Sequence, residues 1–211
     1  MSVLRYFDIY KFNVIQKRNM RKKKEHNNIE KYAEFDDEIN RTYRYLLRRK
    51  WDESLPQVTF VMLNPSDADE NKDDPTLDKC IKFAQNENKY GSLEVVNLFA
   101  YIATKPGKLK KADDPVGQKN DLCILSATKR ADLIILAWGA WLGNVSARKY
   151  PSIKNRAEAV LNLISGQKTL HCLKLTEKEY PLGLTKQKFP RHPLYLRDST
   201  KPIIFPFNIE R

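Results

Sequence analysis

The chain has 211 residues, of which 41% are hydrophobic and 30% are charged, a balance typical of a globular protein and not of a disordered one. This length is enough for one domain with a complete core and too short for two comfortable ones. No apolar stretch approaches the length of a membrane span, and the first residues lack the layout of a signal peptide. We therefore expect a cytoplasmic protein with no membrane contact.

The net charge of +12 and the pI near 9.5 favour an anionic partner, of which a polyphosphate backbone is the commonest. The first basic cluster, in residues 17–24, lies in the only compositionally biased stretch of the chain. We expect a basic N-terminal extension over residues 1–40 and a single α/β domain over residues 41–211. Taken alone, such a charge run is usually just solvated surface.

Apolar runs of β-favouring residues predict strands that are buried on both faces, as in parallel sheets. The first run covers residues 58–63 and stops before Pro65, which cannot continue central pairing because it lacks an N–H and has a fixed φ. Later runs cover residues 95–99, 133–139 and 170–173, and a last apolar segment covers residues 190–196.

Helical patterns with start signals lie between these runs. Residues 73–75 precede apolar residues at i, i+4 and i+7, which predicts a helix to about residue 88. Residues 113–115 predict the start of a second helix that ends near residue 131, and residues 153–164 predict a third. Helix capping alone explains the acidic residues at these starts. Alternating strands and helices predict a three-layer α/β fold with a central, mostly parallel sheet of four or more strands.

Polar and turn-forming residues follow the predicted strands. Because ligands bind at the carboxyl edge of open α/β sheets, these residues are candidate ligand contacts. The alternative for each is a local structural role, since Asn, Pro and Ser commonly form turns and Trp is common in cores. The candidates are Asn64, Pro65, Ser66, Asp67, Asn97, Phe99, Thr104, Trp138 and Gly139.

Two basic clusters flank the same expected edge of the sheet. One follows the second predicted strand, and the other leads to Arg191 and His192. Their coincidence favours nucleic-acid binding, with Arg191 as a substrate contact. The expected contacts to the nucleic-acid backbone are Lys105, Lys108, Lys110, Lys111, Lys186 and Lys188.

We expect neither a metal nor an organic cofactor. The three cysteines lie far apart and each falls within an apolar pattern, which indicates reduced core thiols and no metal or nucleophile role. A metal-dependent nuclease or phosphoesterase that uses Asp67, Asp69 and Asp73 is the lowest-ranked alternative, because loop carboxylates without a histidine are a weak ligand pattern.

Several short motifs follow one another along the chain, at residues 43–51, 62–69, 73–76, 96–100, 104–106, 114–117, 120–121, 137–139 and 192–196. In this order they resemble the family catalogued as domain of unknown function sixteen-forty-three. The resemblance covers about residues 41 to 205. It names a family without naming an activity.

A second resemblance supplies chemistry, and it rests on the order Asn64-Pro65, Asn97, Trp138-Gly139 and His192-Pro193. This order is similar to that of the uracil-DNA glycosylase superfamily. The resemblance implies that Asn64 holds the attacking water, that Asn97 pairs with a base edge and that His192 stabilises the departing base. Each role is physically sensible, because an amide offers a donor and an acceptor and a positioned donor stabilises developing charge.

We therefore expect a nucleic-acid- or nucleotide-directed protein of uracil-DNA glycosylase-like fold that hydrolyses an N-glycosidic bond, with DNA favoured over RNA. Such enzymes extract the base from its stack. The alternative is a non-catalytic module of the same fold that binds nucleic acid or a nucleotide, including one that inhibits another protein.

Overall fold

The computed structural model describes residues 29–86, 89–174 and 184–206, so the basic cluster at residues 17–24 lies outside the described part of the chain. The strands are β1 (Glu30–Phe35), β2 (Arg44–Lys50), β3 (Gln57–Met62), β4 (Ser92–Asn97), β5 (Leu133–Leu136), β6 (Leu170–Lys174) and β7 (Lys201–Ile204). The helices are α2 (Pro75–Gln85), α3 (Asn120–Arg130) and α4 (Pro151–Ile164), and the 3₁₀ helices are η2 (Pro106–Lys111), η3 (Trp141–Asn144) and η4 (Pro193–Tyr195).

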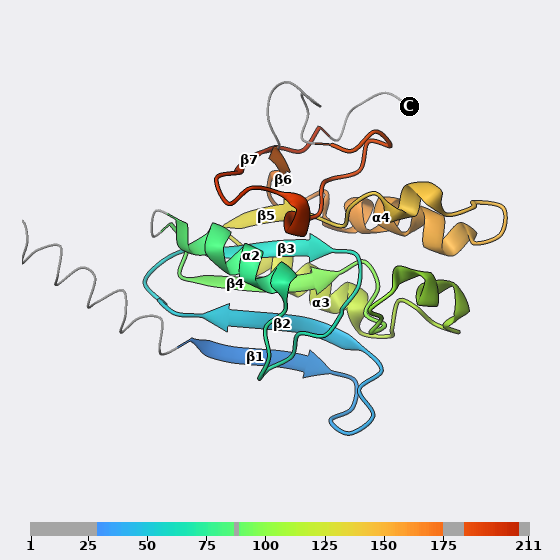
Figure 1. The fold of residues 1–211 in the computed structure, drawn as a ribbon, viewed down its shortest axis with the longest axis horizontal. Coiled ribbons are helices and arrows are strands. Elements are labelled where there is room, and N and C mark those ends of the chain that lie inside the picture. Colours follow the sequence, from blue (N-terminus) through green and yellow to red (C-terminus); the bar gives the residue numbers. More distant parts are fainter. Residues whose placement is uncertain (1–28, 87–88, 175–183, 207–211) are drawn as a thin grey trace, which may run out of the picture.

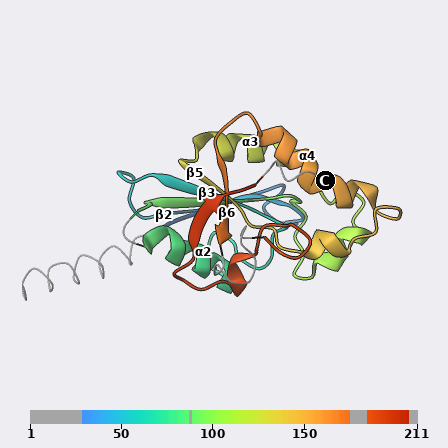
Figure 2. The same cartoon turned by 90° about the horizontal axis from the view of Figure 1, so that it is seen from above.

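All seven strands belong to one sheet, with α2 on one face and α3 and α4 on the other (Figures 1 and 2). The strand order is β1-β2-β4-β3-β5-β6-β7. β3 pairs in parallel with β4 and β5, and β5 with β6, whereas the remaining pairs are antiparallel. The predicted α/β fold with a parallel centre is confirmed, although the sheet as a whole is mixed.

The order of the strands reverses between β3 and β5. The chain leaves β3 for β4 on one side, but it leaves β5 for β6 on the other side. Two neighbouring strands whose connections diverge in this way leave a crevice outside their carboxyl ends, which is where open α/β sheets bind ligands.

The central strands are largely apolar because side chains on both faces are covered. The ring of Phe60 on β3 meets the ring of Phe83 on α2 edge-on, with centroids 5.7 Å apart. Val61, the next residue, packs in the cluster that contains the buried residues of α3 and α4. Even Thr59 is paired, because its hydroxyl donates to the carbonyl of Ala127 at 3.3 Å. This two-sided burial is what the apolar run predicted.

Some predicted elements differ from the structure. Residues 113–115 do not begin a helix, because the carboxylate of Asp114 accepts from the backbone N–H groups of Val116 and Gly117 in a turn and α3 begins at Asn120. The apolar segment at residues 190–196 contains η4, and the last strand is β7 further along the chain. β1 pairs with β2, so the sheet begins before residue 41. In the described ranges, no helix is long and apolar enough to cross a membrane.

Arg49 on β2 holds the loop between β3 and α2 against the sheet. Its side chain is 0% exposed, and its guanidinium donates to the carboxylate of Asp73 from Nε at 2.9 Å and from Nη2 at 2.7 Å. It also donates to the backbone carbonyl of Asp69 at 2.5 Å. A buried cation with several acceptors fixes those acceptors strongly, because losing it leaves them unpaired.

We predict that Arg49→Met lowers the free energy of unfolding by about 3 kcal/mol, because a carboxylate and a carbonyl lose a buried partner. Arg48→Met is the matched control. Arg48 is the neighbouring residue, its side chain is 35% exposed and it pairs with an exposed Glu30 at 3.1 Å. That substitution should cost less than about 1 kcal/mol. Urea unfolding of the three proteins measures the difference, and equal losses in both variants would contradict this role for Arg49.

Candidate functional site

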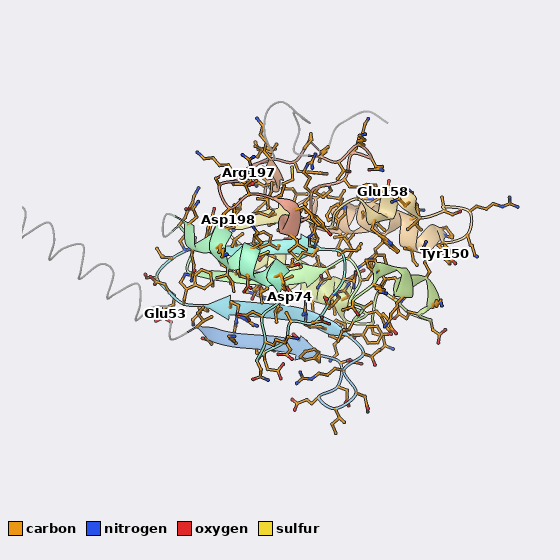
Figure 3. The ribbon with its side chains drawn as sticks, viewed as in Figure 1. Glu53, Asp74, Tyr150, Glu158, Arg197 and Asp198 are labelled. Carbon is orange, nitrogen blue, oxygen red and sulfur yellow. The ribbon has the colours of Figure 1, made fainter. Side chains whose placement is uncertain are left out.

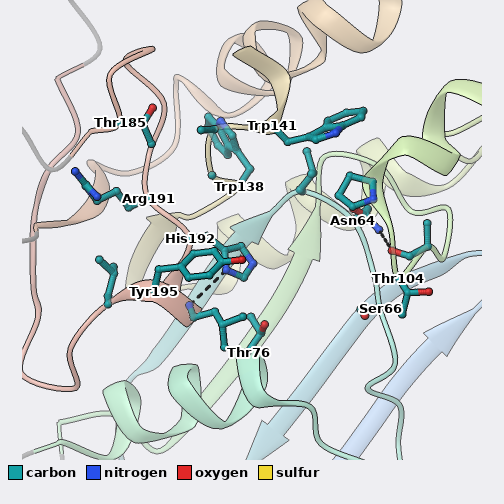
Figure 4. Close-up of a pocket in the computed structure, with 17 residues that line it drawn as sticks. Asn64, Ser66, Thr76, Thr104, Trp138, Trp141, Thr185, Arg191, His192 and Tyr195 are labelled. Atoms are coloured by element: carbon teal, nitrogen blue, oxygen red, sulfur yellow. Dashed lines mark hydrogen bonds between the residues drawn. The ribbon is translucent and has the colours of Figure 1, made fainter. Parts of the chain in front are cut away.

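A cleft of about 470 Å³ lies at the carboxyl ends of β3 and β5 (Figure 4). Its walls come from the segments after β3 and β5, from the segment before η2 and from residues 184–196. The volume is within the usual range of small-ligand sites, roughly 300–1,000 Å³. The lining residues that bear polar or aromatic side chains are Asn64, Ser66, Thr76, Thr104, Trp138, Trp141, Thr185, Arg191, His192 and Tyr195.

Asn64 follows β3, and its amide orientation is fixed by the backbone. Its Nδ2 donates to the carbonyl of Ala103 at 2.6 Å and to that of Pro65 at 2.8 Å. The bond to Ala103 is one of the dashed lines in Figure 4. Because both hydrogens of the amide have acceptors, the NH₂ end must face the backbone, and Oδ1 remains as the acceptor that the side chain offers.

His192 lies on the opposite wall and is held by the turn after β5. Gly139 has a φ of +73°, and a Cβ added there would lie 3.3 Å from the Cβ of His192. The N–H of Gly139 donates to the carbonyl of Pro190 at 2.9 Å. Glycine is favoured here because the backbone is left-handed and approaches His192 closely. The Trp138-Gly139 turn therefore positions the histidine.

The imidazole of His192 is arranged to donate from Nε2. Its Nδ1 accepts from the backbone N–H of Leu194 at 3.4 Å, so the neutral ring carries its hydrogen on Nε2. Burial lowers the pKa of His192 below its ordinary value of 6.5, and the nearby carboxylate of Asp74 opposes this shift. The folded protein at neutral pH thus favours the uncharged imidazole.

A second cavity of about 60 Å³ contains the most unusual polar group of the site, the side chain of Asn97. Asn97 ends β4 and is 1% exposed, and neither Nδ2 nor Oδ1 has a hydrogen-bond partner in the described part of the chain. Asn64 and His192 line this cavity as well as the cleft. A buried amide left unpaired costs about 1–3 kcal/mol, so such groups are normally satisfied by water or a ligand.

Arg44, at the start of β2, reaches the same small cavity. It is 4% exposed, its Nη1 donates to the carbonyl of Ala68, and its Nε has no partner among the described residues. Burial lowers the pKa of Arg44 to about 10, and the carboxylate of Asp74 opposes the shift, so the guanidinium stays charged at neutral pH. A cation, an unpaired amide and a carboxylate therefore surround one cavity.

Asp74 has a structural role of its own. It is the N-cap of α2, and its side chain accepts from the backbone N–H of Leu77 at 2.8 Å. In Figure 3 it lies at the start of α2, in front of the sheet. This capping role was predicted, but its place beside Arg44 and Asn97 was not.

The structure brings together many of the residues predicted from strand ends. Ser66, Thr104, Trp138, Gly139 and Arg191 line the cleft together with Asn64 and His192, and Asn97 lies in the adjoining small cavity. The remaining three do not line either cavity: Asp67 is exposed, Pro65 is buried, and Phe99 is fully buried in the core. The apolar run continues past Asn97 into the core, which is why Phe99 was wrongly grouped with the ligand contacts.

Two of the three acidic residues considered for a metal site, Asp69 and Asp73, have structural partners. Asp69 accepts from the backbone N–H groups of Asn71 and Lys72, each at 2.7 Å, and Asp73 pairs with Arg49. Within residues 29–86, 89–174 and 184–206, no group of three or more His, Cys, Asp or Glu side chains is placed to hold a metal ion. The cysteines form no disulfide, and burial raises the pKa of the Cys172 thiol to about 11.

Two of the predicted basic residues are sequence neighbours of residues that line the cleft, because Lys105 lies between Thr104 and Pro106 and Lys186 follows Thr185. Lys105, Lys108 and Lys111 are exposed in or next to η2, and Lys186 and Lys188 are exposed on the turn that leads to Arg191. Lys110 differs, because its ammonium lies over the rings of Trp141 and Tyr150.

Sequence reasoning missed Arg44, Thr76 and Thr185 as site residues, and it missed Asp74 as a cavity residue. Arg44 lies on a strand next to the parallel centre, where no strand-end rule applies. Thr76 and Asp74 were attributed to helix capping alone. The motif at residues 43–51 was the one signal that could have drawn attention to Arg44.

We predict that the pKa of His192, followed by NMR of its ring protons, is below 6.5 and falls further in Asp74→Asn. Asparagine keeps the helix cap but removes the charge that opposes the shift. The folded protein disfavours the protonated ring. His192 therefore contributes stability that is fully present above pH 6.5 and is lost as the pH falls through the pKa that His192 has in the folded protein. A pKa of 6.5 or higher, or a rise in Asp74→Asn, would contradict this electrostatic arrangement.

Comparison with known proteins identifies a family. The family model described as protein of unknown function (DUF1643) matches residues 44–194, a range that includes the lining residues of both cavities except Tyr195 and Leu196. No curated protein and no solved structure matches the chain. Because the matched range covers more than half of the sequence, the chain belongs to the DUF1643 family.

Proposed function

We propose that this protein inserts the base of a nucleotide or nucleic acid into the cleft and hydrolyses the N-glycosidic bond of that base. The observation that carries the proposal is the unpaired, fully buried side-chain amide of Asn97, which lines a cavity shared with Asn64 and His192. A fold keeps an unsatisfied buried amide at a cost, and functional sites are where such costs are found.

Recognition is assigned to the small cavity. A nucleobase edge presents amide-like donors and acceptors, and Asn97 offers both kinds of group. The Nε–H of Arg44 adds a second donor next to it. A base oxygen that reached this cavity would therefore meet a cation as well as an amide, and charge-assisted hydrogen bonds are about twice as strong as neutral ones.

The chemistry is assigned to Asn64 and His192, two of the four residues that line both cavities. Oδ1 of Asn64 accepts from a water whose oxygen attacks the anomeric carbon of the sugar. As the new carbon–oxygen bond forms, the carbon–nitrogen bond to the base breaks and its electron pair leaves with the base. Nε2–H of His192 donates to the base oxygen on which negative charge collects, and the proton of the water ends on the released base or in solvent.

A binding module without catalysis is the second candidate, and one observation favours it. In the described lining of the large cleft there is no Asp or Glu, and both amide hydrogens of Asn64 are used by backbone carbonyls. Such a cleft recognises a base well, but it provides no strong base to activate water. The same fold could then serve recognition alone.

Release of free base distinguishes the two candidates. The full chain is incubated with DNA and RNA oligonucleotides that carry normal, deaminated and modified bases, and with nucleosides and nucleotides, and free base is measured by chromatography. We expect Asn64→Ala and His192→Ala to reduce release by about a hundredfold or more, because each removes one group aimed at the transition state. Asn97→Ala should weaken binding of the same substrates.

Matched controls come from the same residue types elsewhere. His171→Ala removes a histidine whose Nδ1 contacts only the nearby carbonyl of Thr169, and Asn155→Ala removes an exposed asparagine. Both variants should keep full activity. If no substrate yields free base but a nucleotide binds and Asn97→Ala weakens that binding, the hydrolysis is refuted and the binding module takes its place. If Asn97→Ala changes neither release nor binding, the cleft is not a base site.

A further inference from the structure

Two aromatic rings extend the wall of the cleft outward under a pair of lysines. The ammonium of Lys110 lies 5.5 Å from the ring centre of Trp141 and 5.4 Å from that of Tyr150, and the ammonium of Lys149 lies 5.5 Å from Tyr150. Both rings are half-buried. We call these four residues, Lys110, Trp141, Lys149 and Tyr150, the aromatic shelf. Tyr150 is labelled in Figure 3 at the start of α4.

The two chain segments that meet at the shelf contain no acidic residue. Residues 101–112 and residues 140–157 include no Asp or Glu, although the chain as a whole has 26 of them. The exposed charges of these segments are therefore all positive, and they include Lys108, Lys111 and Arg148. In both Figure 1 and Figure 2, η2 lies beside the segment that leads into α4. Such a surface attracts a polyanion over its whole length.

The shelf is held rigidly in place. Both rings pack against the larger hydrophobic core. The ammonium of Lys154 on α4 donates to the carbonyls of Leu142 and Gly143 at 2.9 and 3.2 Å, which ties η3 to α4. Rings that are already ordered lose little conformational entropy when a ligand stacks on them. A lysine ammonium lies over each ring, and such a contact contributes only about 0.5–1 kcal/mol at an exposed site, so a stacked base can replace it.

The shelf is continuous with the cleft. Trp141 lines the cleft, and the ammonium of Lys110 lies over its ring. Thr104 and Pro106, at the start of η2, also line the cleft. A nucleotide whose base lies in the cleft would therefore have its neighbour in the chain at the shelf. Bases stack on exposed aromatic rings without regard to sequence, but only where the base faces are not already covered by a duplex.

We propose that the aromatic shelf holds the nucleotide next to the one in the cleft, and that the ligand is single-stranded nucleic acid and not a free nucleotide. One neighbouring base stacks on Trp141 or Tyr150 in place of Lys110, whose ammonium then pairs with a phosphate together with Lys149. The inference rests on the proposed function, since it takes the cleft as the site of the central base. A single strand also presents its bases without the cost of unpairing them.

The test is a length series with the full chain. Fluorescein-labelled single-stranded oligodeoxynucleotides from about two to eight nucleotides are titrated by anisotropy, and mononucleotides and a hairpin duplex of the same sequence compete with them. We expect affinity to rise by roughly tenfold or more from a mononucleotide to a strand of about four, because at least one added base stacks. The duplex should compete less well than the single strand.

The variants separate stacking from charge and from stability. Tyr150→Leu keeps apolar volume but loses the ring, and Tyr150→Phe keeps the ring. We expect Tyr150→Leu to lose roughly tenfold for the longer strands and Tyr150→Phe to lose little. Lys110→Ala with Lys149→Ala should weaken binding and flatten its salt dependence by about 0.7 per lost phosphate contact. The matched pair is Lys89→Ala with Lys129→Ala, because Lys89 also lies over a tyrosine, 5.9 Å from the ring of Tyr90, and both lysines are exposed.

Three results would overturn the shelf. Equal affinities for a mononucleotide and for longer strands would refute the shelf. The proposed function would still stand in that case if Asn97→Ala weakens the binding of mononucleotide and strand alike. An equal loss in Tyr150→Phe and Tyr150→Leu, or in the two lysine pairs, also refutes it. If strands bind in a length-dependent way that Tyr150→Leu reduces while Asn97→Ala has no effect, the shelf is retained and the base site in the cleft is refuted.

Discussion

Two buried arginines on one antiparallel strand hold the loop on which the site depends. Arg49 donates to the carboxylate of Asp73 and the carbonyl of Asp69, and Arg44 donates to the carbonyl of Ala68. Both arginines are almost fully buried. Burying a guanidinium is unfavourable unless its donors are used, so these bonds leave the loop little freedom. The loop that follows Asn64 and ends in the cap of α2 is thereby fixed against the sheet, and one wall of both cavities is fixed with it.

The opposite wall depends on a different constraint, the left-handed backbone of Gly139. This backbone brings the segment before η4 close to the end of β5, and the close approach fixes the position of His192. Between the two fixed walls lie polar groups with no hydrogen-bond partner among the described residues, and they include both side-chain polar atoms of Asn97 and Nε of Arg44. A rigid frame around unpaired groups is the arrangement expected of a preorganised binding site, because the fold has already ordered what the ligand needs. The proposed base site rests on this frame.

The sequence predicted the parallel centre and much of the cleft, because a strand-ending Asn, Pro or Gly is local chemistry. Asn64, Asn97 and Gly139 each follow an apolar run, and parallel strands bring such ends to one edge. The site residue that the sequence did not reveal depends on contacts between distant parts of the chain. Arg44 reaches the site from β2, and nothing in its own neighbourhood of the sequence indicates burial beside Asn97. Residues 113–115 have the composition of a helix start, but the carboxylate of Asp114 closes a turn instead. A carboxylate that accepts from backbone N–H groups two or three residues further along the chain occurs in turns as well as at helix starts, so the composition of these residues does not decide between the two.

The side-chain amide of Asn97 is the most direct probe of this account. In a ¹⁵N-labelled sample its NH₂ pair is identified as the pair missing from the spectrum of Asn97→Ala, and it is followed while a nucleotide or a short single strand is added. The account predicts that this pair shifts on saturation, because a base edge supplies the partner that the fold lacks. Backbone amides of the cleft wall should shift with it. If the ligand binds and shifts other resonances while the Asn97 pair stays in place, the buried amide is not the base-reading group and the account is contradicted.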